Sequence, residues 1–360
     1  MAESRAIFLT LPALCYHTTT VSHRHSWIFA SATLVRFPLR DAIFFERGSH
    51  ESSVHVKALN EAKLFICATL AAAALLLSTS ARAQDTPCVF DYASLAYAGI
   101  PQEQARCLLR PVLIGGHLGA TLKRLPPPLD KLLGGSLKVD KDALRRYLKE
   151  HNINEADIGG SLSDPVARAN TLDPNAPLAR YFVIHDVSTP NYLDKPFPPD
   201  INEAMWPLND LKKRWANRRV THVYINRLGE SVTAVDFGTE LPDPNHGTKF
   251  ARDRLRNRGK GLYLHVELVQ PRRSDPQGRP GNDSIAPLPG FTDAQLERLA
   301  LCYIAASVRR GLWLIPAFHA AIDVGIADAH DDPQNFDLVR WANHLDKLLK
   351  EIKKNRKHGQ

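Results

Sequence analysis

The sequence has few of the features that mark several large classes of protein. It contains no apolar run of the roughly 20 residues that a membrane-spanning helix needs, which argues against a polytopic membrane protein. Its 44% hydrophobic and 23% charged residues exclude a disordered chain, and 20 glycines and 25 prolines are too few for a fibre. The sequence has 46 Lys and Arg residues and 38 Asp and Glu residues, so its net positive charge is mild, and no nucleic-acid partner is indicated.

Three common catalytic and binding motifs are also missing. Without G-x-S-x-G, a hydrolase with a nucleophile elbow is unsupported. Without H-E-x-x-H or a glycine-rich phosphate loop, a zincin protease and a P-loop nucleotide site are unsupported too. The remaining candidates are histidines and carboxylates scattered along the chain.

An apolar stretch well inside the chain has the pattern of a secretory signal peptide. Lys57 and Lys63 flank its start, residues 64–77 form its 14-residue core, and Ala81-Arg82-Ala83 provides small residues at a cleavage site. The alternative is a buried core helix. We expect residues 56–83 to be a signal peptide, which predicts a periplasmic or secreted protein with no transmembrane segment after cleavage.

Residues 1–55 have no role in this interpretation, because a signal peptide belongs at an N-terminus. No methionine lies between Met1 and Met205, so translation would have to begin near Val56 on a non-standard codon. We therefore expect residues 1–55 not to be part of the natural product.

Export changes the interpretation of the cysteines. Cys88 and Cys107 lie close together in the sequence, and an oxidising compartment allows them to form a disulfide. Cys302 falls within an apolar helical pattern and is expected to be a buried small side chain.

The remaining chain divides near residue 175. Residues 84–175 predict short helices separated by turns, at 92–97, 102–109 and 141–151. This extension could cover a groove, bind a partner or brace a sheet. Residues 176–350 form the second domain, where strand and helix signals mix.

The second domain predicts an α/β fold, a mixed central β-sheet flanked by helices, to which the mostly helical N-terminal extension is attached. Residues 181–184 and 262–269 are apolar runs of strand length, and Gly229 lies in the turn of a hairpin. Thr292 and Gln295 form the capping-box pattern of a long helix at 293–309.

Histidines and carboxylates cluster in two places of this domain. His185 ends a buried strand, where sites are often built, although a polar residue there can simply terminate the strand. Two histidines and four carboxylates then occur within fourteen residues, from His319 to Asp332. Nitrogen and oxygen ligands of this kind suit zinc, although spacing alone is a weak signal.

Five blocks of the domain, taken in order, resemble the type-2 N-acetylmuramoyl-L-alanine amidases, the family with a peptidoglycan-recognition-like fold. The blocks are residues 181–190, 221–230, 264–268, 291–295, and His319 with Asp332-Pro333. The resemblance implies a mixed sheet, a Zn²⁺ ion held by His185, His319 and Asp332, and hydrolysis of the amide between N-acetylmuramic acid and L-alanine of peptidoglycan or muropeptides.

The resemblance also implies roles for two further residues. Glu267 would be the general base that takes a proton from the attacking water. His330 occupies the position where the family often has a lysine, and its imidazole would stabilise the oxyanion. His222 could support the site or be a structural histidine, and His246 is expected in a loop of the cleft.

Some residues depart from the family pattern. His319 and Asp332 are thirteen residues apart, which is longer than usual, and Phe318 and Gln334 replace glycines. His330 or Asp331 could therefore be the third ligand in place of Asp332.

Two functional classes remain open. The first is an exported zinc amidase, and the second is a non-catalytic peptidoglycan-binding module on the same fold. The joint presence of His185, His319, a carboxylate and Glu267 favours the enzyme, because a binding module needs none of them together. A structural envelope protein is a third possibility, and the sequence does not predict an oligomeric state.

Overall fold

The structure is a computed structural model that describes residues 87–114, 117–242 and 246–357, all within one compact unit. Its centre is a five-stranded sheet in the order β5-β4-β6-β3-β7. The strands are β3 (Tyr181–Asp186), β4 (Val223–Ile225), β5 (Ser231–Thr233), β6 (Tyr263–Leu268) and β7 (Ile315–Phe318). β4, β6, β3 and β7 are parallel, whereas β5 pairs antiparallel with β4. The predicted mixed sheet flanked by helices is therefore confirmed.

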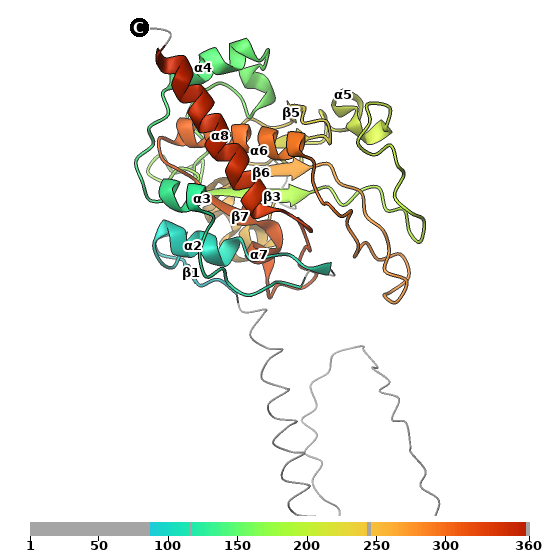
Figure 1. Ribbon diagram of the computed structural model, residues 1–360. Coiled ribbons are helices and arrows are strands. Elements are labelled where there is room, and N and C mark those ends of the chain that lie inside the picture. Colours follow the sequence, from blue (N-terminus) through green and yellow to red (C-terminus); the bar gives the residue numbers. More distant parts are fainter. Residues whose placement is uncertain (1–86, 115–116, 243–245, 358–360) are drawn as a thin grey trace, which may run out of the picture. The chain divides into compact units, whose positions relative to one another are not determined.

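The parallel pairing of β3 sets the position of the polar residues at its end. All six residues of β3 are buried, as expected for a strand covered on both faces. His185 lies opposite Glu267 of β6, and Ile184 lies opposite Phe318 of β7. The carboxyl ends of the three strands therefore meet at one edge of the sheet. In Figure 1 the arrowheads of β3 and β6 point toward the side on which long loops extend.

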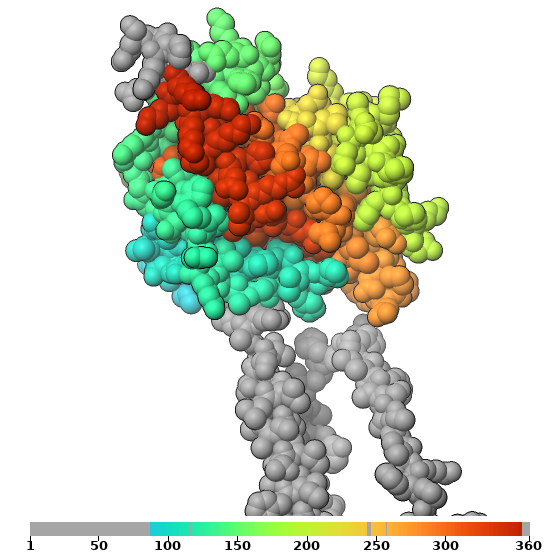
Figure 2. Space-filling model, viewed as in Figure 1, coloured from blue at the N-terminus to red at the C-terminus, as the bar shows by residue number. Residues whose placement is uncertain are grey.

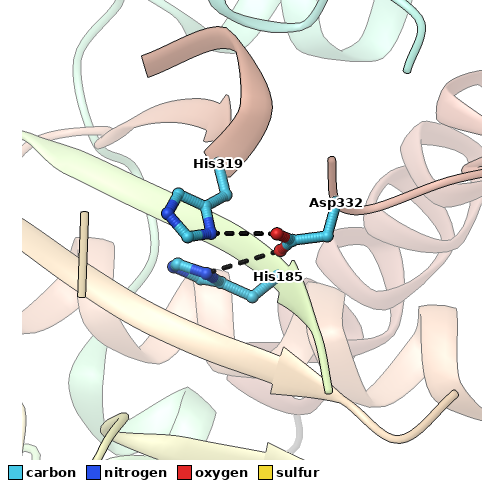
Figure 3. Close-up of side chains that lie close together, drawn as sticks. All are labelled: His185, His319 and Asp332. Atoms are coloured by element: carbon cyan, nitrogen blue, oxygen red, sulfur yellow. Dashed lines mark ion pairs between the residues drawn. The ribbon is translucent and has the colours of Figure 1, made fainter. Parts of the chain in front are cut away.

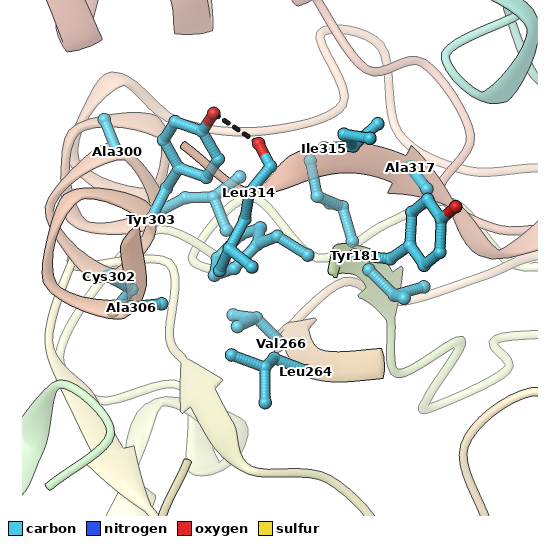
Figure 4. Close-up of a cluster of buried hydrophobic side chains, with 14 of the residues drawn as sticks. Tyr181, Leu264, Val266, Ala300, Cys302, Tyr303, Ala306, Leu314, Ile315 and Ala317 are labelled. Carbon is cyan, nitrogen blue, oxygen red and sulfur yellow. Dashed lines mark hydrogen bonds between the residues drawn. The ribbon is translucent and has the colours of Figure 1, made fainter. Parts of the chain in front are cut away.

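Two long helices contribute most of the apolar packing. α6 (Asp293–Arg310) begins at the predicted capping box and ends at Gly311, whose left-handed φ of 77° suits glycine. α8 (Leu338–Lys357) packs on α6. Figure 4 shows side chains of α6 against strand residues, with the hydroxyl of Tyr303 donating to the carbonyl of Leu314 at 2.7 Å. Cys302 is free and buried in this layer, as predicted.

The described part of the N-terminal extension contains three α-helices, and one predicted helix is wrong. The helices are α2 (Pro101–Leu108), α3 (Pro127–Leu132) and α4 (Lys141–Glu150). Residues 92–97 were predicted to be helical. Instead, a small hairpin forms here: β1 (Phe90–Asp91) pairs with β2 (Ala96–Tyr97), and residues 92–95 make the turn between them. The carboxylate of Asp91 accepts from the backbone N–H of Ala93 at 2.9 Å, a local bond that favours a turn over a helix. The predicted Cys88–Cys107 disulfide is present.

The extension shares its core with the sheet domain. α2 contacts β7 and α7 (His319–Asp323), while α3 and α4 contact α8. The backbone N–H of Tyr97 donates to the hydroxyl of Tyr181 at the start of β3, at 2.8 Å. In Figure 2 the extension (cyan to green) lies along α8 (red). These contacts brace the sheet from outside the edge that carries the polar residues.

The loops contain short helical elements. These are η2 (Glu155–Asp157), η3 (Pro207–Asn209), α5 (Leu211–Arg214), η4 (Ala251–Leu255), η5 (Arg256–Arg258) and η6 (Lys260–Leu262). Among the described residues, no helix combines the length and apolarity needed to cross a membrane. The predicted signal peptide, residues 56–83, lies outside the described part of the chain, as do residues 1–55.

Candidate metal centre

Three buried side chains meet at the carboxyl edge of the sheet. His185 comes from the end of β3, His319 opens α7 directly after β7, and Asp332 comes from the following loop (Figure 3). One ligand atom of each lies within 4.8 Å of the other two. Nδ1 of His319 is 3.0 Å from Oδ1 of Asp332, and Nδ1 of His185 is 3.5 Å from Oδ2. His185 and His319 are 134 positions apart in the sequence, and the pairing of β3 with β7 brings them together.

The far side of each imidazole is held by another group. Nε2 of His319 lies 2.9 Å from Oδ2 of Asp323, and Asp323 also accepts from the backbone N–H groups of Lys249 and Phe250. Nε2 of His185 lies 2.9 Å from Nδ1 of His265. Partners on the Nε2 side leave both Nδ1 atoms facing the same point.

The donor set fits a zinc ion. Nδ1 of His319 is buried, and it makes no hydrogen bond to any side chain or backbone group in the described ranges, although a carboxylate oxygen is 3.0 Å away. A buried imidazole nitrogen that makes no hydrogen bond and faces a carboxylate oxygen marks a position that a cation can fill. Two imidazole nitrogens and one carboxylate oxygen are ligands that zinc prefers, and they leave a position open for water or substrate.

The site's electrostatics follow from burial among opposite charges. Burial disfavours a charge on His319, but the carboxylates of Asp332 and Asp323 outweigh it and raise the pKa of the ring well above its usual value. Burial and the neighbouring histidines lower the pKa of His185. For Asp332, burial is outweighed by His319, and its pKa is lowered, so its carboxylate is anionic.

Backbone contacts select Asp332 over its neighbour as the third member. Its Oδ2 accepts from the backbone N–H of Asp186 at 3.1 Å, and its carbonyl accepts from Ala320 at 2.9 Å. The carboxylate of Asp331 instead accepts from the side-chain amide of Gln334 at 2.7 Å. The alternative that Asp331 belongs to the cluster is therefore not supported by its placement.

A buried ion pair anchors the same loop. Both oxygens of Asp186 accept from the guanidinium of Arg272, at 2.7 and 2.9 Å, and the two side chains are fully buried. Oδ2 of Asp186 also accepts from the backbone N–H of Gln334. The residue after His185 thus ties the loop of Asp332 to β3.

Glu267 extends from β6 beside the three ligand candidates. Its Oε1 is 3.9 Å from Nδ1 of His185, and its Oε2 is buried without a hydrogen bond to any described residue. Burial, with the nearby charge of Asp332, raises the pKa of Glu267 well above its usual value. A raised pKa makes this carboxylate a stronger base toward the proton of a water molecule.

His330 lies at the exposed side of the cluster. Its ring stacks on that of His319 with 4.3 Å between centroids, and its Nδ1 is 3.7 Å from Oδ1 of Asp332. The side chain is 51% exposed. Burial of the remainder and the charge of His319 lower its pKa, so the ring is a neutral hydrogen-bond donor at neutral pH.

A cavity of about 660 Å³ opens over the cluster. Its lining includes all five predicted site residues, His185, Glu267, His319, His330 and Asp332. Trp215, Arg218, Tyr224, Lys249 and Arg279 form part of its walls, and His246 lines it as expected. No described residue of the N-terminal extension is in this lining, so of the three roles considered for the extension, its contacts agree with bracing.

Two further histidines, His222 and His265, lie next to the cluster and differ in what they contact. One nitrogen of His222 lies 3.0 Å from the backbone nitrogen of His265, and the other lies 3.0 Å from the carbonyl oxygen of Thr239. Both nitrogens are thus used in contacts with the backbone, which supports a structural role for His222. His265, which sequence reasoning missed, contacts the ring of His185 directly. Strand alternation could have found it, because residues 265 and 267 of one strand point to the same face.

Comparisons with known proteins give one structural match. Neither a family model nor a curated protein matches the sequence. A solved structure described as "crystal structure of Se-Met AmpD derivative" matches with 19% identity, over 51% of this chain and 92% of that chain, with a TM-score of 0.30. Similarity at this level carries no information on function, so the functional proposal below depends on the site and its residues.

Proposed function

We propose that the protein is an exported, zinc-dependent amidase that hydrolyses the amide between N-acetylmuramic acid and L-alanine of peptidoglycan. The observation that carries the proposal is the convergence of His185, His319 and Asp332 beside the carboxyl group of Glu267, in one open cavity. The choice of substrate follows from the five sequence blocks that resemble muramoyl-alanine amidases, because these blocks contain the same four residues. The Cys88–Cys107 disulfide supports export, since disulfides persist in oxidising compartments.

Each residue has a role that its position allows. A zinc ion bound by His185, His319 and Asp332 would supply a Lewis acid that activates water and polarises the scissile carbonyl. Glu267 accepts a proton from the attacking water at its unpaired Oε2 and returns it to the departing amide nitrogen of L-alanine. His330 donates a hydrogen bond to the negative charge that develops on the carbonyl oxygen. The products are a muramic acid carboxylate and a peptide with a free amino terminus.

The test uses Glu267→Gln on the purified protein. The amide keeps the shape of the side chain but cannot accept the proton. We expect one zinc ion per wild-type chain, release of stem peptides from peptidoglycan, and a loss of about 10²- to 10⁴-fold in Glu267→Gln with zinc retained. Glu297→Gln, the same change on the outer surface of α6, should leave both measurements unchanged.

Zinc content measured by mass spectrometry and released peptides measured by chromatography separate the alternatives. A protein that binds zinc but releases no stem peptide from any peptidoglycan tested would favour the binding module over the enzyme. Full activity of Glu267→Gln would exclude Glu267 as the base.

A further inference from the structure

His265 is a buried polar ring in the interior of β6, where the fold needs only an apolar side chain. It is 3% exposed and lies between the rings of His222 and His185. Its Nδ1 is 2.9 Å from Nε2 of His185. A polar group in such a place costs stability unless it is hydrogen-bonded, so the contact with His185 is the reason to look for a role.

The proton between the two rings can be assigned from the cluster. For Nδ1 of His185 to act as a metal ligand, it must carry a lone pair, and the neutral ring then has its proton on Nε2. This N–H points at Nδ1 of His265, which must accept it. His265 is therefore required as the tautomer with its own proton on Nε2.

Three groups hold the His265 ring in that orientation. Its plane is stacked on His222, with 10° between the rings, and its Nδ1 meets His185. Gly247 closes the outer edge, because a Cβ atom at this glycine would be 2.9 Å from Nε2 of His265 and 3.0 Å from Cε1. With a φ of +87°, Gly247 also adopts a conformation that favours glycine. These contacts keep Nδ1 of His265 directed at His185.

We propose that His265 is a positioning residue that fixes the tautomer and orientation of His185 for metal binding. This inference rests on the zinc site of the proposed function. The two imidazole ligands are then supported differently, since a carboxylate holds His319 and a neutral imidazole holds His185. Groups that orient a metal ligand in this way typically change metal affinity by 10- to 100-fold when removed.

The experiment compares three variants of the full chain by competition for zinc with a chelator. His265→Phe keeps a buried ring but removes the acceptor, and it should weaken zinc binding about 10- to 100-fold. His265→Asn places its side-chain oxygen near the original Nδ1 and should bind zinc within about threefold of the wild type. His222→Asn is the comparison variant: it replaces the ring stacked on His265, just before β4, but leaves the contact between His265 and His185 in place, so it should weaken zinc binding less than His265→Phe does. Circular dichroism reports whether each variant is folded.

Two results would overturn the proposal. One is wild-type zinc affinity in a folded His265→Phe variant, and the other is a loss in His222→Asn as large as that in His265→Phe, which would indicate a structural effect only. Nitrogen-15 NMR of the zinc-loaded wild type gives an independent reading, because His265 should carry its proton on Nε2. Neither measurement uses peptidoglycan. A wild type that binds zinc but releases no stem peptide would therefore refute the proposed function and leave the role of His265 standing.

Discussion

The first four residues of β3 and its last two are equally buried but have opposite surroundings. Tyr181 to Ile184 lie among the apolar side chains of the core, where burial stabilises the fold, and Figure 4 shows Tyr181 in this layer. His185 and Asp186 continue the same strand into a group of ionisable side chains. Burial of such groups is costly unless they are paired, so nothing in the stability of the sheet calls for them.

This difference separates residues that stabilise the fold from residues that belong to the candidate metal centre. Within this one parallel strand, the change from one kind to the other takes place between residues 184 and 185, where the pairing with β7 ends while the pairing with β6 continues. If this division is correct, changes on one side should affect folding and leave zinc binding intact, and changes on the other should do the reverse.

The largest effect is expected from the removal of a ligand. His319→Ala should lose zinc binding and amidase activity together, because only two protein ligands would remain. We expect the zinc affinity to fall more than about a hundredfold, beyond the effect of losing a supporting residue. Chelator competition and stem-peptide release measure the two losses, and zinc bound at wild-type affinity would remove His319 from the site.

The matching change in the apolar layer is Leu299→Ala. Leu299 is fully buried on α6, and its truncation should lower the free energy of unfolding by about 2–5 kcal/mol. Denaturation with urea measures this loss. Zinc affinity of the folded variant should equal that of the wild type, and a concurrent loss of zinc would show that the two regions are not separable.

Local sequence signals predicted the elements of the fold well. The capping box at Thr292 and Gln295 predicted the start of α6, since its hydrogen bonds are local. The same reasoning was wrong for residues 92–97, where the carboxylate of Asp91 closes a turn. In both places a side-chain bond to the backbone decided the outcome.

The site was predictable only as far as the resemblance reached. His185, His319 and Asp332 were named from the sequence, and the structure places them together. The choice of Asp332 over Asp331 depends on backbone contacts across the loop, and the role of His265 depends on the register of β6 with β3. Alternation along β6 places His265 on the same face as Glu267, but its contact with His185 and the choice of Asp332 depend on packing between distant segments, which spacing does not give.

A smaller effect concerns the pH dependence of stability. Burial lowers the pKa of His222 from 6.5 to about 4, so the folded chain resists a proton that the unfolded chain accepts. The contribution is therefore present in full above pH 6.5 and is lost as the pH falls from 6.5 to about 4, amounting to about 3 kcal/mol.

Comparison with His222→Asn tests this assignment, because the amide oxygen can still accept from the backbone N–H of His265 but does not titrate. With zinc removed by a chelator, the stability of the wild type relative to the variant should fall over this range. Parallel curves of unfolding free energy against pH would contradict the burial of a neutral His222.

The last prediction concerns His330, which lies on the boundary between cavity and cluster. His330→Ala should keep zinc but lose about 10- to 1,000-fold in rate, the range for one donor to an oxyanion. His330→Lys should recover much of that rate, because the resembled family often has lysine at this position and an ammonium group is also a donor. Asp332→Ala should instead lose zinc, so zinc content and stem-peptide release on the three variants distinguish ligand from donor. If His330→Ala loses zinc while Asp332→Ala keeps it, the two roles must be exchanged.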